Sequence, residues 1–408
     1  MKFSKARQLF LVSTIGILVA VLFSGCNLVT IDYLFLATQA TAIGNNPNAC
    51  PGGEIEIYAV DSQSGAVRKA ASPVCSGGKT PVALAVSADE THLYVANRDD
   101  MTVVHFAIAS NGSLASKDTV HLATPPVSLA VSQSGKQLFV VSGTTSATLT
   151  EYALSSGTIG SITAQRPLTL SSYPGDTMIP TAVTVLANGG AVYATAYDAS
   201  AYNPGGTTTS TANPGWVFGF TIDSSGNLGP TPGSPYSAGV KPSALVAEPT
   251  NRFLYVTDFA SSQMIGYGVY TGFALNFLQN GPFRTGNEPN GIAVDPRGKF
   301  LYTSNAVDSS VSAFVIDQPT GTPSSAINPT GSSVNITDTQ PVAIATEPAL
   351  GRYVYTANYL GNSISGFRLD PTAGNLKQTQ ATPYPSGAKP TAIALIPRGN
   401  HATQSVNP

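Results

Sequence analysis

The chain has 408 residues, of which only 10% are Asp, Glu, Lys or Arg, and it is rich in Gly (39) and Pro (30). Its 20 basic and 22 acidic residues give a formal net charge of -2, so it lacks the clustered positive charge of nucleic-acid-binding proteins. We therefore expect no nucleic acid among its partners. The low charge and the many Gly and Pro residues indicate short strands joined by turns.

Residues 1–26 have the pattern of an export signal. Lys2, Lys5 and Arg7 precede an apolar run over residues 9–23, which is shorter than a typical transmembrane helix. We therefore expect the protein to be exported rather than to cross a membrane with this segment.

The apolar run ends in Phe23-Ser24-Gly25-Cys26, which resembles the lipobox of bacterial lipoproteins, although Phe23 stands where Leu is usual. The resemblance implies that Cys26 is lipidated, becomes the N-terminus and anchors the protein to a membrane. Asn27 replaces the Asp that retains some lipoproteins in the inner membrane, so we expect the periplasmic or outer-membrane side of the envelope. An ordinary signal peptide with an incidental cysteine is the alternative.

The other two cysteines flank a predicted hairpin. Residues 54–60 and 67–74 read as strands, and opposed residues of such a hairpin have position numbers with a constant sum. A turn centred between Gln63 and Ser64 sets this sum, and the position numbers of Cys50 and Cys75 add up to nearly the same value. We therefore expect a disulfide between Cys50 and Cys75, formed in an oxidising compartment, with two reduced thiols as the alternative.

An internal repeat organises the rest of the chain. Its most regular copy covers residues 289–305, recurs at 81–97, and is found more loosely elsewhere. Each copy begins with a marker proline, and these lie 45 to 62 residues apart. The marker prolines are Pro81, Pro126, Pro180, Pro242, Pro289, Pro341 and Pro390.

Each repeat contains short apolar runs bounded by Gly, Asp and Pro, which predict four strands. One four-stranded unit cannot bury both of its faces, so seven units of about 50 residues are expected to close radially. The sequence therefore predicts an all-β fold, a seven-bladed β-propeller of four-stranded blades over residues 27–397. Residues 398–408 are expected to form a flexible tail.

The leftover strands at the two chain ends predict how the ring closes. The C-terminus supplies only an inner strand, residues 391–396, whereas the N-terminus supplies residues 32–37, 54–60 and 67–74. We expect these pieces to share one blade, which would remove an open strand edge.

The second strands of the repeats carry a family resemblance. Leu93-Tyr94-Val95-Ala96-Asn97 and its counterparts at 301–305 and 354–358 resemble the YVTN-type repeat. From about residue 31 to 397 the chain resembles lactonase-type seven-bladed propellers, a family that includes bacterial 6-phosphogluconolactonases. The resemblance implies the fold and, as one option, lactone hydrolysis. The phosphorylated lactone is cytosolic, so export argues against that substrate.

Repetition separates structural residues from candidate functional ones, because a binding site on a ring should use residues found in one blade only. Asn97, Asn305, Asn358 and Asp258 recur after the second strands, so we expect them to cap turns through their side-chain oxygens. The loop that enters an inner strand and the loop that leaves a second strand should share the channel mouth.

The residues expected at this mouth differ from blade to blade. The predicted ligand-binding rim is Lys241, Lys389, Gln340, Arg98, Asp99 and Tyr359. Glu288 and Asp308 are the candidate catalytic residues, each as a general base. A long insertion over residues 198–214 is expected to cover part of the mouth. Solvated rim charge without a ligand is the alternative for Lys241, Glu288 and Lys389, and simple flexible decoration is the alternative for the insertion.

The sequence offers little further support for catalysis. No His-rich or Cys-rich pattern predicts a metal, so we expect no metal and no cofactor. His92 is expected in a turn away from the mouth, and His105 and His121 on outer strands. The leading hypothesis is a monomeric binding module of the cell envelope that takes a protein, glycan or small molecule at the mouth. A lactonase is the alternative, and a structural surface component is a third option.

Overall fold

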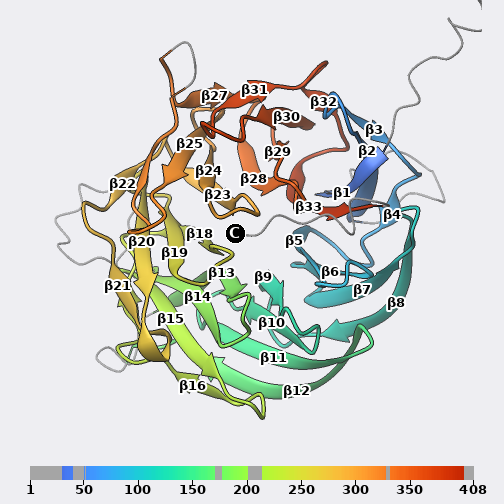
Figure 1. Cartoon of the computed structure of the whole chain (residues 1–408). Coiled ribbons are helices and arrows are strands. Elements are labelled where there is room, and N and C mark those ends of the chain that lie inside the picture. Colours follow the sequence, from blue (N-terminus) through green and yellow to red (C-terminus); the bar gives the residue numbers. More distant parts are fainter. Residues whose placement is uncertain are drawn as a thin grey trace, which may run out of the picture.

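Seven β-sheets form a closed ring in the computed structural model, which describes residues 30–39, 50, 52–170, 177–200, 214–327 and 331–398 (Figure 1). The sheets are antiparallel, and each is radial, with one strand at the centre and the others following outward. The prediction of a seven-bladed β-propeller is therefore confirmed. The described residues contain one short 3-10 turn, η1 (Thr271–Phe273), and no helix long and apolar enough to cross a membrane.

The strands are numbered along the chain, and the first strand named in each blade lies at the centre of the ring. Blade 1 has β5 (Pro81–Val86), β6 (His92–Asn97), β7 (Thr102–Ile108) and β8 (Leu114–His121); blade 2 has β9 (Pro126–Val131), β10 (Gln137–Ser142), β11 (Thr148–Ser155) and β12 (Thr158–Pro167). Blade 3 has β13 (Met178–Val185), β14 (Ala191–Asp198), β15 (Gly215–Ile222), β16 (Leu228–Pro230) and β17 (Tyr236–Ser237). Blade 4 has β18 (Pro242–Ala247), β19 (Phe253–Asp258), β20 (Gln263–Val269), β21 (Leu275–Phe277) and β22 (Phe283–Arg284).

The same order holds in the remaining blades. Blade 5 has β23 (Pro289–Val294), β24 (Phe300–Asn305), β25 (Ser310–Ile316), β26 (Pro323–Ser325) and β27 (Val334–Ile336); blade 6 has β28 (Pro341–Thr346), β29 (Tyr353–Asn358), β30 (Ser363–Leu369), β31 (Leu376–Gln378) and β32 (Tyr384–Pro385). Blade 7 has β33 (Pro390–Pro397), β1 (Thr30–Thr38), β2 (Glu54–Asp61), β3 (Val67–Lys69) and β4 (Val74–Cys75).

The fourth strand is continuous only in blades 1 and 2. In the other five blades it is broken into two short pieces that pair with different parts of the same third strand. In blade 3, for example, the break contains Pro232, Gly233 and Pro235. Two of these residues are prolines, which cannot donate a ladder hydrogen bond, so pairing is interrupted there.

Blade 7 is built from both ends of the chain, as the sequence predicted. The strand β1 pairs with β33 on one side and with β2 on the other, so that Phe35 lies opposite both Ala394 and Ile57. Figure 1 shows the blue N-terminal strand beside the red C-terminal strand. The innermost strand β33 also contacts β28 and β5, which closes the ring.

The predicted disulfide ties the outer part of the same blade. Cys50 and Cys75 are bonded, with their Cα atoms 5.0 Å apart. The strand partner of Cys75 is Glu54, so Cys50 lies before β2 and reaches Cys75 from outside the ladder. The bridge therefore joins the segment that enters β2 to the short edge strand β4.

A buried tyrosine connects most pairs of neighbouring blades. The Tyr302 hydroxyl in β24 donates a 2.8 Å hydrogen bond to the carbonyl oxygen of Gly374 in blade 6. Tyr94, Tyr193, Tyr255 and Tyr355 make the equivalent contact with the next blade. Blades 2 and 7 have Phe139 and Phe35 at this position, which supply the ring without the hydroxyl. The tyrosine of the repeat thus joins the apolar core between blades to a specific hydrogen bond.

The expected caps at the ends of the second strands are only partly right. Asp258 accepts hydrogen bonds from the backbone amides of Val240 and Lys241, as a cap does. The amide of Asn305 instead donates to the hydroxyls of Ser310 and Ser312 in the next strand. Since an asparagine amide can donate, the buried side chain joins the second and third strands rather than closing a turn.

Three predictions fall on residues outside those that the structure describes. These are the signal segment with the lipidation site Cys26, the tail after residue 398, and most of the insertion over residues 198–214.

Candidate functional site

Backbone hydrogen bonds place the two predicted rim loops side by side. In blade 4, the Phe259 amide just after β19 donates to the carbonyl oxygen of Lys241 just before β18. In the same way, a backbone amide donates to a carbonyl oxygen in three other blades: Arg98 to Thr80, Ala306 to Glu288 and Tyr359 to Gln340. The loop that enters each inner strand and the loop that leaves the second strand therefore form one face of the ring.

The residues that enter the inner strands have an unusual backbone. Thr80, Glu288, Gln340 and Lys389 have φ values of 55°, 52°, 58° and 51°. Positive φ is uncommon for residues other than Gly, so its recurrence at one point of four blades is a property of the repeat. The sequence pattern did not reveal this conformation. Three of these four residues, Glu288, Gln340 and Lys389, are among those expected at the mouth.

A bulge follows each marker proline. The register between the inner and second strand shifts by one residue there, as between Pro289 and Gly291, so that one residue per blade stays unpaired. The seven unpaired residues are Val82, Val127, Thr181, Ser243, Asn290, Val342 and Thr391. All seven line the central channel, an open cavity of about 580 Å³.

The polar members of this ring differ in how their side chains are used. Ser243 and Thr391 each donate a 2.6 Å hydrogen bond to a carbonyl oxygen of the neighbouring blade, and Thr181 pairs with Thr195. Asn290 makes no side-chain hydrogen bond to any described residue. Its amide is therefore the polar group of the ring that is left for a ligand.

Lys241 lies beside two aromatic rings on the same side of the mouth. Its Nζ is 4.5 Å from the centre of the Phe259 ring and 5.7 Å from that of Tyr197. Burial lowers the pKa of Lys241, and the nearby Glu288 carboxylate opposes that shift. The electrostatic interaction between Lys241 and Glu288 means that blades 4 and 5 bring opposite charges together here.

The two candidate catalytic carboxylates have different surroundings. Asp308 accepts hydrogen bonds of 2.6 Å and 2.8 Å from the backbone and side-chain amides of Asn287, so it holds the entry loop of blade 5. The half-buried Glu288 carboxylate accepts no hydrogen bond from the residues that the structure describes. Glu288 is therefore the better placed of the two to act on a ligand.

The remaining predicted rim residues belong to blades 1, 6 and 7. Arg98 and Tyr359 line the channel, and the Nζ of Lys389 is 5.8 Å from the centre of the Tyr359 ring. Asp99 accepts hydrogen bonds from Thr80 and Arg98, and the Thr80 hydroxyl is the main reason that the pKa of Asp99 is lowered. The backbone amide of Gln340 donates to Ser309 in blade 5.

The three histidines that the structure describes lie away from the channel. His92 begins β6 at the end opposite the mouth rather than lying in a turn, and its ring nitrogen is 2.9 Å from that of His105. His105 bonds Asp118, which also accepts the amide of Ile159 in blade 2. His121 is on the outer strand β8 as predicted. Among the described residues, no group of three or more His, Cys, Asp or Glu side chains could hold a metal ion.

Blades 4 and 5 thus bring together a carboxylate, an ammonium group, an unused amide and aromatic rings at a partly buried mouth. This combination suits a neutral ligand with several hydroxyls, because amides and charged groups bind hydroxyls and rings cover apolar faces. Lys241 and Glu288 were predicted from the sequence, whereas Asn290, Phe259 and Tyr197 were not. Asn290 directly follows a marker proline and Phe259 directly follows a second strand, so blade-to-blade differences at both positions are visible in the sequence.

Comparisons with known proteins give one family and several similar folds. A family model described as lactonase, 7-bladed beta-propeller, matches residues 41–173 and 110–403. Among curated proteins, none matches the sequence. The periplasmic gluconolactonase of Pseudomonas aeruginosa superposes with a TM-score of 0.68 at 18% identity, over 90% of this chain and 99% of that one. A protein of Lactobacillus plantarum does so with a TM-score of 0.68 at 16% identity, over 90% and 100% of the two chains.

Proposed function

Because the chain belongs to the lactonase family of seven-bladed β-propellers, we propose that it hydrolyses a sugar-derived lactone at the channel mouth of blades 4 and 5. The observation that carries the proposal is the Glu288 carboxylate, which is free of hydrogen bonds to the described residues and lies near Lys241. A similar fold in a periplasmic gluconolactonase supports the choice of a sugar lactone.

The proposed reaction is the addition of water to the lactone carbonyl carbon. Glu288 takes a proton from the attacking water as a general base, while the Lys241 ammonium group stabilises the negative charge that forms on the carbonyl oxygen. The ring C–O bond then breaks, and the protonated Glu288 returns its proton to the leaving ring oxygen, which yields the open hydroxy acid and regenerates the carboxylate. Asn290 and the rings of Phe259 and Tyr197 orient the hydroxyls and the apolar faces of the substrate.

The test is hydrolysis of glucono-1,5-lactone by the purified mature chain, followed as acid release above the uncatalysed rate. We expect Glu288→Gln to lower kcat/KM by about 100-fold or more, mostly through kcat, because loss of a general base has this size of effect. Asp308→Asn tests the competing carboxylate. Glu90→Gln, the same change at the end of the blade opposite the mouth, is the matched control and should keep full activity.

Turnover by the wild type that Glu288→Gln leaves intact would contradict the proposed role of Glu288. Absence of turnover on this and related lactones would contradict the lactonase and favour the second candidate, an envelope module that binds a glycan or protein. That alternative is supported by the two lysine and aromatic pairs on opposite sides of the mouth, Lys241 with Phe259 and Lys389 with Tyr359.

We further infer that the protein works outside the cytoplasm on a lipid anchor at Cys26. The disulfide between Cys50 and Cys75 supports export, since such bonds persist in oxidising compartments. The change Cys26→Ser is expected to move the protein from the membrane fraction to the soluble fraction while leaving its thermal midpoint unchanged. Retention of this variant in the membrane fraction would exclude the lipid anchor.

A further inference from the structure

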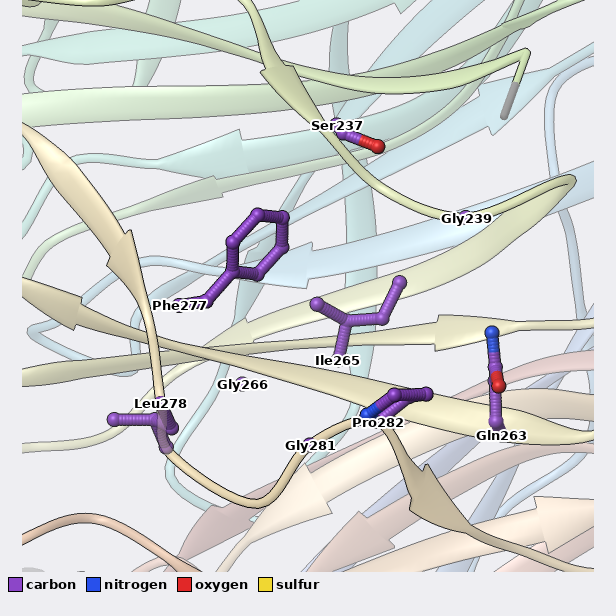
Figure 2. Close-up of a pocket in the computed structure, with 9 residues that line it drawn as sticks. All are labelled: Ser237, Gly239, Gln263, Ile265, Gly266, Phe277, Leu278, Gly281 and Pro282. Carbon is purple, nitrogen blue, oxygen red and sulfur yellow. The ribbon is translucent and has the colours of Figure 1, made fainter. Parts of the chain in front are cut away.

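A second cavity lies far from the channel, at the outer boundary between blades 3 and 4. It is a crevice of about 340 Å³, and Figure 2 shows Phe277 and Ile265 extending into it from neighbouring strands. No charged side chain lines it. The lining residues are Ser237, Gly239, Gln263, Ile265, Gly266, Phe277, Leu278, Gly281 and Pro282.

Blades 3 and 6 fill the equivalent place with a plug of hydroxyl groups from their own broken outer strand. In blade 3, the backbone amide of Gly219 donates to the Ser234 hydroxyl at 2.9 Å, and the hydroxyls of Thr231 and Tyr236 are 2.8 Å apart. Blade 6 repeats this arrangement with Gly366, Thr382, Thr379 and Tyr384.

Blade 4 keeps the backbone of this plug but has lost all of its hydroxyls. At the same spacing it has Leu278, Gly281 and Phe283 in place of threonine, serine or threonine, and tyrosine. The Leu278 amide still donates to the Gly266 carbonyl at 2.9 Å. The amides of Thr231 and Thr379 donate in the same way to the carbonyls of Gly219 and Gly366. The local fold is therefore the same, and only the side chains differ.

The missing hydroxyl leaves one backbone donor at the crevice. The amide that corresponds to Gly266 donates to Ser234 in blade 3, to the Ser333 carbonyl in blade 5 and to Thr382 in blade 6. No residue that the structure describes accepts a hydrogen bond from the Gly266 amide. Since buried backbone amides are nearly always paired, this one calls for an external acceptor.

We propose that the crevice binds a small uncharged alcohol with an aromatic or alicyclic body, whose hydroxyl oxygen replaces the missing serine or threonine hydroxyl. The apolar body packs between Phe277, Ile265 and Pro282, and the absence of charged lining residues disfavours an ionised ligand. The hydroxyl proton has an acceptor in the Gln263 amide oxygen, since the Gln263 nitrogen already donates to Asp258. The site is separate from the channel, so it does not depend on the proposed lactonase activity.

The test uses fluorine NMR of the mature chain with two probes, 4-fluorobenzyl alcohol and fluorobenzene. We expect the alcohol to bind at least ten times more tightly, because only the alcohol can accept the Gly266 hydrogen bond. Gly281→Ser, which restores the plug, should weaken alcohol binding at least tenfold. Lactone hydrolysis by this variant should be unchanged, so the two proposals fail independently.

A second variant guards against misfolding, because a Cβ at Gly281 would lie 3.2 Å from the Phe283 ring. Phe277 is 62% exposed, so Phe277→Ala should leave folding intact and weaken alcohol binding at least fivefold. Tyr270→Ala, which removes a neighbouring exposed ring outside the crevice, is the matched control and should bind normally. Equal binding of the two probes, or no binding of the alcohol to the wild type, would overturn the proposal.

Discussion

Asp32 has an extreme environment for an acidic residue. It lies in β1 of the closing blade, fully buried, and neither carboxylate oxygen has a hydrogen-bond partner among the described residues. Burial raises the pKa of Asp32 to about 9, with further contributions from Glu347 and Glu90 and an opposing one from Arg352. The folded protein therefore holds this carboxyl protonated at neutral pH.

The raised pKa predicts how stability depends on pH. The unfolded chain ionises Asp32 near its ordinary pKa of 3.8, whereas the folded chain does so only near 9, so its contribution to stability is full at low pH and falls between these values. Asp32→Asn removes this loss. The free energy of unfolding of the variant, compared with that of the wild type, should therefore rise by roughly 2 to 4 kcal/mol between pH 4 and pH 7. Urea unfolding of both proteins at pH 4, 5.5 and 7 measures this, and parallel profiles would contradict it.

Single residues of the site were only partly predictable. Lys241 and Glu288 were placed at the mouth because their positions before marker prolines are visible in the sequence, and the structure brings them together. Asp308 shows the limit of such reasoning, since nothing in the sequence says that its oxygens hold the Asn287 amides. Whether a side chain is free or engaged depends on neighbours that only folding supplies.

Among the strands, β33 is the one on which closure depends. It pairs with β1 over most of its length and contacts the inner strands β28 and β5. Deleting residues 389–408 removes it, which leaves β1 with an unpaired edge and the ring without one inner strand. We expect a large fall in the thermal midpoint or failure to fold, measured by circular dichroism.

The matched control for this truncation is deletion of residues 399–408 alone, which leaves β33 intact. This shorter deletion should keep the wild-type midpoint. If the two truncated proteins melted at the same temperature as the wild type, the closing role of β33 would be refuted.

The bulges after the marker prolines are the elements that connect fold to function. Each bulge releases one residue from the ladder, and the seven released residues line the channel. The repeat thus supplies a position in every blade whose side chain is not needed for pairing. Because Ser243 and Thr391 are used to bind neighbouring blades, the asymmetry of the channel is concentrated at Asn290.

Across the complete ring, repetition provides an internal standard. Blades that share one backbone show what a given position normally does, so a blade that departs from the rule points to another use. The tyrosine contact between blades and the hydroxyl plug of blades 3 and 6 are rules of this kind. Two features depart from these rules: the polar mouth of blades 4 and 5, and the crevice of blade 4, where the hydroxyl plug is missing.

Periodicity and spacing were enough to predict the class of fold, the number of blades, the sharing of blade 7 by the two chain ends and the disulfide. These are local properties repeated seven times, so they are readable without coordinates. The folded ring was needed to show which rim groups are engaged, which residues bulge into the channel and where a backbone amide lacks an acceptor. Those properties arise from contacts between blades, because residues distant in the sequence become neighbours only when the ring closes.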